Sequence, residues 1–452
     1  MKQIVFISFF ISLFIGCEPV DYKPFTTDPE LFQRSMKALT DVIVYDIFSP
    51  PVASRIYAYP SIAAYEALIP GYNGYQSMAG QLTDLELPPQ PDKTKEISHE
   101  VAALKAFLVV GKTMIFSEDR IEAFEKKLWE EIEDSGIPSP VFNESIAYGE
   151  VVANHILAWA DKDNYKQTRT FPKYTVKNEP YAWKPTPPDY AEGIEPSWNK
   201  IRLLILDSAS QFVPPPPTPY DMDENSLFHR EMMEVYDIGV NLDQEQEEIA
   251  KFWDCNPFVS HHSGHAMFAT KKITPGGHWI GITAISTRQS QSNFMETAEA
   301  FSRVSISLFD AFIVCWDEKW RSILIRPETV INEFVDQDWA PLLQTPPFPE
   351  YTSGHSVIST AAATTLTDLF GEEFHFLDTT EVEYGMPPRS FTSFLNASSE
   401  AAISRIYGGI HYMPAITNGV DQGRDVGNFV VGNLKTKYSL PDQNASLINS
   451  EN

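Results

Sequence analysis

Apolar residues recur at steps of three and four along most of this chain, which is the spacing of an amphipathic helix. Alternation of apolar and polar residues, the pattern of a half-buried strand, is scarce. The fold we predict is therefore all-α, with two helical bundles in one compact unit. The helical pattern is clearest at residues 29–48, 98–116, 117–136, 143–163, 224–240, 243–254, 295–316 and 355–371.

Two proline-rich stretches interrupt this periodicity. Prolines and aromatic residues replace the pattern over 168–190, and the run "FVPPPPTPY" at 212–220 cannot be helical. We place the join between the bundles at the second stretch. The expected organisation is a signal peptide (1–16), a lipid tether (17–30), an N-terminal helical bundle (31–211), a proline-rich connection (212–220), a C-terminal helical bundle with the active site (221–438) and a flexible tail (439–452).

The first residues read as an export signal. One lysine precedes an apolar run from Ile4 to Ile15, which is too short for a membrane span of about twenty residues. Gly16 and Cys17 follow directly, in an arrangement that resembles a bacterial lipoprotein processing site. We expect a mature protein that begins at a lipid-modified Cys17 and lies outside the cytoplasm. Ordinary signal cleavage nearby, with Cys17 incidental, is the alternative.

Composition narrows the classes of partner. The 452 residues carry a formal net charge of −27, so no basic surface for nucleic acid is expected. Any site for an anion must be locally basic and shielded by its own walls. The three cysteines form no Cys-x-x-Cys pair and no disulfide framework. Cys255 and Cys315 are expected to be core thiols.

Three short stretches in the last third combine cations, small hydrogen-bond donors and imidazoles. Arginine offers a planar fork of donors to a tetrahedral oxyanion, and lysine adds a point charge. A helix N-terminus after "SGH" would favour negative charge, and Gly354 would let the anion approach the backbone. Lys319 and Arg326 are seven positions apart, so we expect both on one helix face. We call the following seven residues the cradle: Lys319, Arg326, Ser353, Gly354, His355, Arg405 and His411.

The order Lys-x6-Arg-Pro, Ser-Gly-His and Ser-Arg-x5-His resembles the superfamily of type 2 phosphatidic acid phosphatases and vanadium haloperoxidases. The resemblance covers roughly residues 316–411 and implies a haloperoxidase-like helical fold. It also implies that the cationic residues Lys319, Arg326 and Arg405 hold the oxygens of vanadate. Ser353 and Gly354 would complete the binding of vanadate. His411 would bond to vanadium, and His355 would be the acid–base residue.

One position departs from the phosphatase form of this pattern. That form carries an aspartate four residues after the last histidine, where this chain has Ala415. The aspartate would orient the histidine, and Asp421 is the substitute that could reach it from the next turn. The absence of an aspartate at position 415 favours the haloperoxidase branch of the superfamily. In that branch Trp316 and Phe348 stand where the resemblance implies aromatic residues of a halide pocket.

The reaction that the resemblance implies is vanadate-dependent oxidation of a halide by hydrogen peroxide to hypohalous acid. The aromatic pocket favours iodide or bromide, as in bacterial iodo- and bromoperoxidases, and small organic acceptors are a further expected partner. The alternative is a secreted acid phosphatase that hydrolyses phosphate monoesters through a phosphohistidine. A binding module with an inactive site is disfavoured, because every cradle position is filled.

The segment 252–279 also resembles bacterial members of this group and is rich in histidine. Its four histidines suggest a metal cluster, but no carboxylate stands at clear helical spacing from them. We therefore expect them to line the cleft mouth or to bond loop carbonyls. They are His261, His262, His265 and His278.

Overall fold

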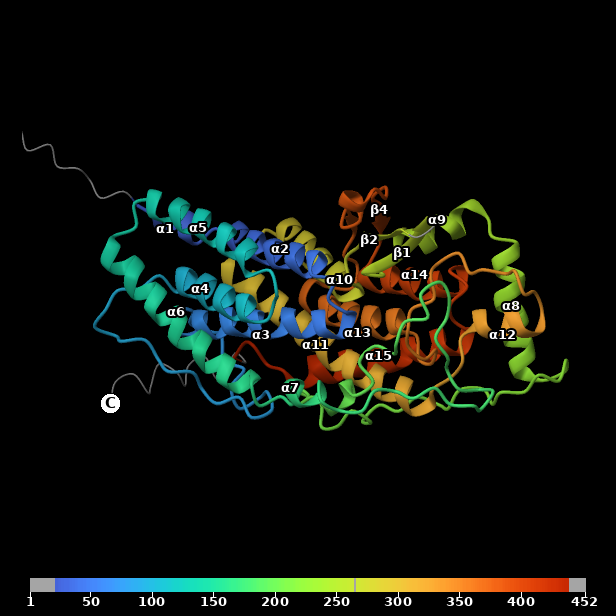
Figure 1. Cartoon of the computed structure of the whole chain (residues 1–452). Coiled ribbons are helices and arrows are strands. Elements are labelled where there is room, and N and C mark those ends of the chain that lie inside the picture. The colour runs from blue at the N-terminus through green and yellow to red at the C-terminus, as the bar shows by residue number, and fades with distance from the viewer. Residues whose placement is uncertain (1–20, 264–265, 439–452) are drawn as a thin grey trace, which may run out of the picture.

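The computed structural model describes residues 21–263 and 266–438 (Figure 1). The expected signal peptide, the expected anchor at Cys17 and the expected tail at 439–452 lie outside the described residues. So does His265 of the histidine-rich segment. Within the described ranges, no helix combines the length and apolar character needed to cross a bilayer.

Helices build the N-terminal half, as the periodicity predicts. Ser98 is the N-cap of α4, and its side chain accepts a hydrogen bond from the Val101 amide at 3.3 Å. Ser117 precedes α5, but its hydroxyl donates to Asp46 instead of capping that helix. The helices are α1 (Lys23–Thr26), α2 (Glu30–Tyr45), α3 (Pro50–Leu68), α4 (His99–Thr113), α5 (Glu118–Asp134), α6 (Ser139–Ala160) and α7 (Tyr165–Thr168), with 3₁₀ turns η1 (Ile69–Gly71) and η2 (Trp198–Lys200).

The C-terminal half is also helical, with two small antiparallel hairpins. The hairpins are β1 (Phe258–Ser263) with β2 (Ala266–Lys271), and β3 (Phe376–Asp378) with β4 (Arg389–Phe391). The helices are α8 (Leu227–Val240), α9 (Gln244–Phe252), α10 (Pro275–Gln289), α11 (Phe294–Ser322), α12 (Pro327–Phe334), α13 (Gly354–Phe370), α14 (Phe394–Tyr407) and α15 (Met413–Asn433), with the 3₁₀ turn η3 (Val382–Tyr384).

The long helix α11 joins the two halves. It packs against α3 on one side and α13 on the other, and one hydrophobic core runs through residues of both halves. In Figure 1, α11, α13 and α15 occupy the middle, with α4 and α6 toward one end and α8 and α12 toward the other. The structure thus confirms an all-α fold with helical bundles in one compact unit. The segment boundaries at 211 and 220 stay a prediction.

Several helices carry no clear helical pattern in the sequence. Every residue of α3 is buried, so this helix has no polar face from which a periodicity could be recognised. Pro50 and Pro51 open it at the first turn, where a missing amide hydrogen costs nothing. Residues 213–220 contain no helix, as their prolines require.

Candidate active site

The first cradle motif spans a break between two helices. Lys319 lies in the last turn of α11, which ends at Ser322 where Ile323 takes a left-handed conformation with φ 44°. Arg326 is the N-cap of α12, and Pro327 is the first residue of that helix. The expectation that Lys319 and Arg326 share one helix face is therefore wrong. The chain turn brings both side chains to Phe348 instead, each 5.0 Å from its ring centroid.

The Ser-Gly-His motif starts α13, as predicted. Ser353 is the N-cap, and its hydroxyl accepts a hydrogen bond from the Ser356 amide at 3.4 Å. Gly354 and His355 form the first turn of the helix. A Cβ placed on Gly354 would have only Trp316 within reach, 3.9 Å away. The absent side chain therefore leaves free space beside the N-terminus of α13, where an anion is favoured.

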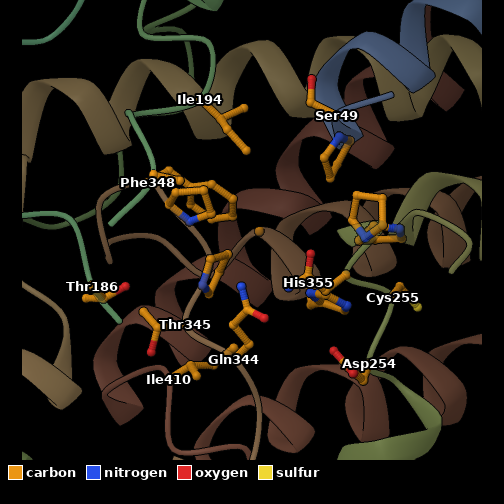
Figure 2. Close-up of a pocket in the computed structure, with 18 of the residues that line it drawn as sticks. Ser49, Thr186, Ile194, Asp254, Cys255, Gln344, Thr345, Phe348, His355 and Ile410 are labelled. Carbon is orange, nitrogen blue, oxygen red and sulfur yellow. The ribbon is translucent and has the colours of Figure 1, made fainter. Parts of the chain in front are cut away.

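A cavity of about 540 Å³ connects these motifs. Its wall is formed by residues from both halves of the molecule, including Ser49 from the start of α3. Figure 2 shows Phe348 and Ile194 across this cavity from His355 and Cys255. Of the predicted site residues, six line the cavity: Trp316, Phe348, Gly354, His355, Arg405 and His411. The other three are fully buried behind its wall: Lys319, Arg326 and Ser353.

His411 has a carboxylate partner that the sequence did not reveal. Its Nδ1 lies 2.7 Å from Oε1 of Glu350, which also accepts the Tyr412 amide at 3.0 Å. The missing aspartate is therefore replaced from the loop before α13. Ala415 is indeed buried and apolar, but Asp421 is exposed and pairs with Arg424 at 2.6 Å. The suggestion that Asp421 reaches the histidine is wrong.

The Glu350 contact sets the chemistry of the imidazole. Burial lowers the pKa of His411 well below its usual value, and the nearby cation of Arg326 lowers it further. Burial raises the pKa of Glu350 to about 7, although Arg326 and Lys319 oppose that rise. A neutral His411 with its proton on Nδ1 can donate to Glu350. Its Nε2 lone pair then lies on the other side of the ring, 3.2 Å from Nη1 of Arg326, and is available to bond an electrophilic atom.

His355 is positioned by a backbone carbonyl. Its ring hydrogen-bonds the carbonyl of Trp253, and Arg405 Nη2 donates to the same oxygen at 2.8 Å. Burial lowers the pKa of His355 well below its usual value, and Arg405 adds to the effect. The imidazole is therefore neutral near pH 7. Since it lines the cavity, it is placed to accept a proton from a molecule bound there.

The three cations differ in how far the protein already uses their donors. Lys319 donates to the carbonyls of Pro349 and Glu350 at 3.0 Å each and to that of Thr352 at 2.5 Å. It therefore fastens the loop before α13 and contributes its charge. Burial lowers its pKa to about 7. Arg326 and Arg405 keep their charge near neutral pH, since burial lowers the pKa of each only to about 10.

Two polar atoms of the cradle are left without partners. Nη2 of Arg326 and Nε2 of His355 are buried and make no hydrogen bond with any residue that the structure describes. Leaving a buried polar atom without a partner costs free energy comparable to a lost hydrogen bond. At the start of α13, a bound anion would satisfy the arginine donor, and a proton donor on the bound molecule would satisfy the imidazole nitrogen. Around them lie two arginines, a helix N-terminus and Nε2 of His411, which contacts Nη1 of Arg326 at 3.2 Å. This donor set fits a tetrahedral oxyanion such as vanadate.

Aromatic residues cover one side of the cradle. The rings of Trp316 and Phe348 lie with centroids 5.0 Å apart, and both line the cavity together with Ile194. The indole nitrogen of Trp316 donates to the Ile194 carbonyl at 3.1 Å, which fixes the plane of the ring. The structure thus brings the two predicted halide-pocket residues together.

The histidine-rich segment divides into two parts. The backbone of His261 and His262 lies in β1, where they pair with Phe268 and Met267 of β2. His278 is fully buried in α10, 2.7 Å from Asp378. The expectation that His278 bonds a loop carbonyl is wrong, because its partner is a carboxylate a hundred residues later in the chain. Cys255 and Cys315 are free, buried thiols, as predicted.

Comparisons with known proteins agree with this geometry. The family model of the second helical-bundle domain of VCPO matches residues 299–439. The crystal structure of the first bacterial vanadium-dependent iodoperoxidase superposes with a TM-score of 0.88 at 51% sequence identity. The match covers 94% of this chain and 99% of that one.

Two further structures share the fold at lower identity. The holo-type and apo-type bacterial vanadium-dependent chloroperoxidases are both 17% identical to this chain, with TM-scores of 0.65. Each match covers 86% of this chain, and covers 93% and 94% of the respective chloroperoxidase. No curated protein sequence matches the chain.

Proposed function

Since this chain belongs to the vanadium-dependent haloperoxidases, we propose that it oxidises iodide first and bromide second. In this reaction iodide, hydrogen peroxide and a proton give hypoiodous acid and water. The observation that supports this choice of halide is the Trp316–Phe348 pair beside the cations of the cradle. A small organic acceptor in the same cavity would be the final target of the hypohalous acid.

The residues that would hold vanadate are the cationic and hydrogen-bonding residues of the cradle. Arg326 and Arg405 supply the guanidinium groups, and α13 supplies the Ser353 hydroxyl and the Gly354 amide. His411 would bond the vanadium through Nε2, with Glu350 holding the proton on Nδ1. When bound, vanadate supplies a Lewis-acid centre that activates hydrogen peroxide for halide attack without changing oxidation state.

His355 is the residue that moves protons in this proposal. Neutral at working pH, it accepts a proton from hydrogen peroxide and later returns one to the departing oxygen. The Trp253 carbonyl fixes the orientation of its ring. The buried cations meanwhile stabilise the negative charge that develops on oxygen, without any rearrangement of the protein.

Iodide is favoured by the apolar wall. Moving an ion out of water costs less as its radius grows, and iodide is larger and more weakly hydrated than bromide or chloride. Trp316, Phe348 and Ile194 offer polarisable carbon surface and few donors that could replace a tight hydration shell. For a small halide, the free-energy cost of dehydration would therefore exceed the stabilisation gained from contact with this wall.

The experiment compares three halides on one preparation. Protein loaded with orthovanadate is assayed with hydrogen peroxide and iodide, bromide or chloride, and the ratio kcat/KM is measured for each. We expect iodide to be fastest, bromide slower and chloride slowest. Phe348→Ala should lower the ratio of kcat/KM for iodide to kcat/KM for bromide. A preference for chloride, or an unchanged ratio in Phe348→Ala, would contradict the proposed role of the wall.

A second activity is favoured by the Glu350–His411 pair. The missing aspartate at Ala415 suggested a poor phosphatase, but Glu350 supplies the orientation and basicity that a nucleophilic histidine needs. We propose slow hydrolysis of small phosphate monoesters by the vanadate-free protein, measured with p-nitrophenyl phosphate. Vanadate should inhibit it at the concentrations that restore iodide oxidation. If vanadate does not inhibit the hydrolysis, the phosphatase activity lies outside the cradle.

We also propose that a lipid on Cys17 holds the protein at a membrane outside the cytoplasm. The support is the short apolar run from Ile4 to Ile15 followed by Gly16 and Cys17. Cys17→Ser should move the protein from the membrane fraction to the soluble one. Unchanged fractionation of this variant would contradict the anchor.

A further inference from the structure

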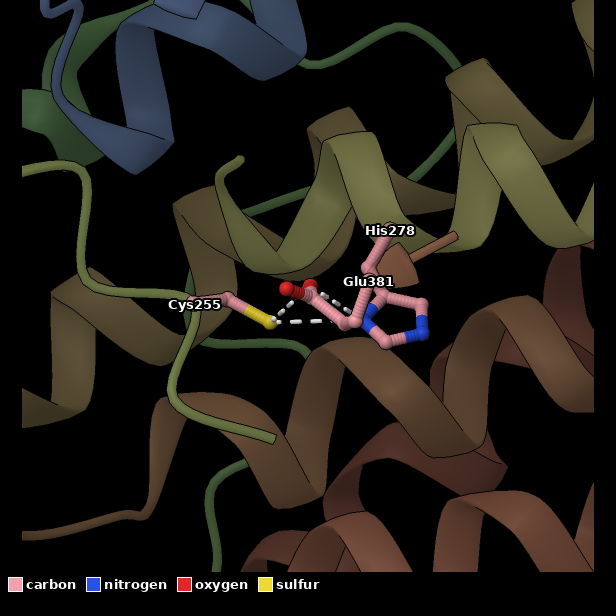
Figure 3. Close-up of side chains that lie close together, drawn as sticks. All are labelled: Cys255, His278 and Glu381. Atoms are coloured by element: carbon pink, nitrogen blue, oxygen red, sulfur yellow. Dashed lines mark hydrogen bonds and ion pairs between the residues drawn. The ribbon is translucent and has the colours of Figure 1, made fainter. Parts of the chain in front are cut away.

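Beside the cradle, three side chains from distant parts of the chain meet in a buried cluster. Cys255 follows α9, His278 belongs to the first turn of α10, and Glu381 directly precedes η3. The thiol Sγ lies 3.4 Å from Nδ1 of the histidine and 3.8 Å from Oε1 of the carboxylate. Nδ1 and Oε1 are 3.1 Å apart (Figure 3). All three side chains are at most 2% exposed.

The triangle formed by these atoms has the size of one face of a tetrahedral metal site. Bonds of about 2.0 Å to nitrogen and oxygen and about 2.3 Å to sulfur put ligand atoms roughly 3.3–3.6 Å apart. The three measured separations, 3.1, 3.4 and 3.8 Å, bracket that range. The two contacts of the thiol are weak hydrogen bonds. Three atoms that meet at these distances are placed to share one metal ion.

The opposite side of His278 has the outer contact typical of a metal-bound histidine. Its Nε2 lies 2.7 Å from Oδ2 of Asp378. The other oxygen of Asp378 accepts the Thr380 amide at 2.9 Å, which holds the carboxylate in place. A carboxylate that accepts a hydrogen bond from Nε2–H favours the tautomer whose Nδ1 lone pair faces Cys255 and Glu381, which is the form that binds a metal.

The charges of the cluster also suit a divalent cation. Two carboxylates flank His278, with Glu381 3.1 Å from Nδ1 and Asp378 2.7 Å from Nε2. These carboxylates would compensate the charge of a divalent ion bound beside Cys255.

We propose that Cys255, His278 and Glu381 bind one borderline divalent metal ion, Zn²⁺ by preference, with its fourth position toward the active-site cavity. Thiolate, imidazole and carboxylate together are a zinc-type donor set, and Cys255 is part of the cavity wall. The ion would join three segments separated in sequence. Trp253, whose carbonyl holds both His355 and Arg405, lies two residues before Cys255. The metal would thus fix the support of the acid–base residue.

The test uses Co²⁺ as a spectroscopic probe of the site on the full chain, stripped with a chelator and kept free of vanadate. We expect one Co²⁺ per chain, with the thiolate-to-cobalt absorption band and the visible bands of a tetrahedral ion. Zn²⁺ should displace the Co²⁺. Because vanadate is absent, the result does not depend on the proposed halide chemistry.

Two cysteine variants make the matched comparison. Cys255→Ser should lose the thiolate band, whereas Cys315→Ser, which removes the other buried thiol, should keep it. Asp378→Asn should keep the band but weaken Co²⁺ binding about 10- to 100-fold, because the carboxylate only orients His278. This variant retains all three ligands, so it tests the site even where Cys255→Ser folds poorly.

Three results would overturn the proposal. The first is the absence of a thiolate band at Co²⁺ concentrations well above that of the protein. The second is a band that persists in folded Cys255→Ser. The third is Co²⁺ bound without thiolate absorption, which would place the ion at another site. Each would identify the Cys255 cluster as a hydrogen-bonded charge network.

Discussion

The N-terminal bundle and the cradle both bury an arginine beside a carboxylate, and the two sites treat it differently. In the bundle, Oδ2 of Asp163 accepts Nε of Arg55 at 2.7 Å and the Tyr59 hydroxyl at 2.9 Å. Oδ1 of the same residue accepts the Tyr165 amide at 2.9 Å. In the cradle, Nη2 of Arg326 has no partner among the described residues.

The difference separates a structural cluster from a binding site. The Asp163 cluster uses the donors around it to satisfy both oxygens of one carboxylate, so nothing is left for a ligand. The cradle surrounds the cations with backbone carbonyls and a shared carboxylate, and still leaves an arginine nitrogen and an imidazole nitrogen unmet. Substitutions in the Asp163 cluster should therefore lower the stability of the protein. Substitutions in the cradle should weaken vanadate binding and lower turnover.

The largest effect is expected at His411. His411→Ala removes the atom that would bond vanadium, so vanadate binding should fall below detection in calorimetry. Thermal stability should change little, because Glu350 stays near Arg326. His155→Ala is the control, since that half-buried histidine lies in α6, outside the cradle, and its ring bonds the Glu86 carbonyl. Vanadate binding retained by His411→Ala would contradict the role of Nε2.

A substitution at His355 should lower turnover without weakening vanadate binding. His355→Ala should keep vanadate affinity near that of the wild type and lower kcat for iodide about 10²- to 10⁴-fold, the usual worth of a general acid–base group. Steady-state kinetics at saturating vanadate measures it. An equal loss of vanadate affinity in His355→Ala and His411→Ala would show that the two histidines do not divide these roles.

Asp163 tests the closed cluster. Asp163→Ala strands the buried charge of Arg55, so the free energy of unfolding should fall by about 3–5 kcal/mol, with vanadate affinity of the folded protein unchanged. Denaturant titration measures the loss. Asp161→Ala is the matched control at the C-cap of α6, two residues earlier, because its pair with Lys166 is exposed and should contribute little to stability. Similar losses in both variants would be against the account.

Glu350 gives the smallest expected effect, because it acts through His411. The amide oxygen of Glu350→Gln can still accept a hydrogen bond from Nδ1–H, but the negative charge is lost, so vanadate affinity should weaken about 10- to 100-fold. Asp421→Asn changes the exposed aspartate that the sequence suggested for this role, and it should leave affinity unaltered. If Asp421→Asn weakened vanadate affinity and Glu350→Gln did not, Asp421 would be the partner of His411.

The sequence predicted those parts of the site that follow local spacing. Ser353 caps α13 because a serine before an apolar run satisfies the free amides of a helix start, and this is visible in a few residues. The order of the cradle motifs and the aromatic pair came from the resemblance to the haloperoxidase superfamily. The fold class followed from the periodicity of the amphipathic helices. The periodicity did not reveal α3, because this helix is buried on all sides and has no polar face.

The rest depends on contacts between distant segments. Glu350 lies in a loop with no periodicity, and only the folded chain brings it to His411, 61 residues later. The Trp253 carbonyl cannot be identified from residue type at all, because every residue has one. The partners of His278 come from the region of β3 and η3, a hundred residues away. The one-face expectation for Lys319 and Arg326 failed because α11 ends between them.

The most direct test of the account is to locate vanadium in crystals of the vanadate-loaded protein by anomalous scattering at the vanadium edge. The account predicts one peak per chain beside Nε2 of His411, within reach of Arg326 and Arg405, and no such peak in His411→Ala. A peak elsewhere in the cavity, or one that survives in His411→Ala, would contradict the claim that the unmet donors of the cradle hold the oxyanion.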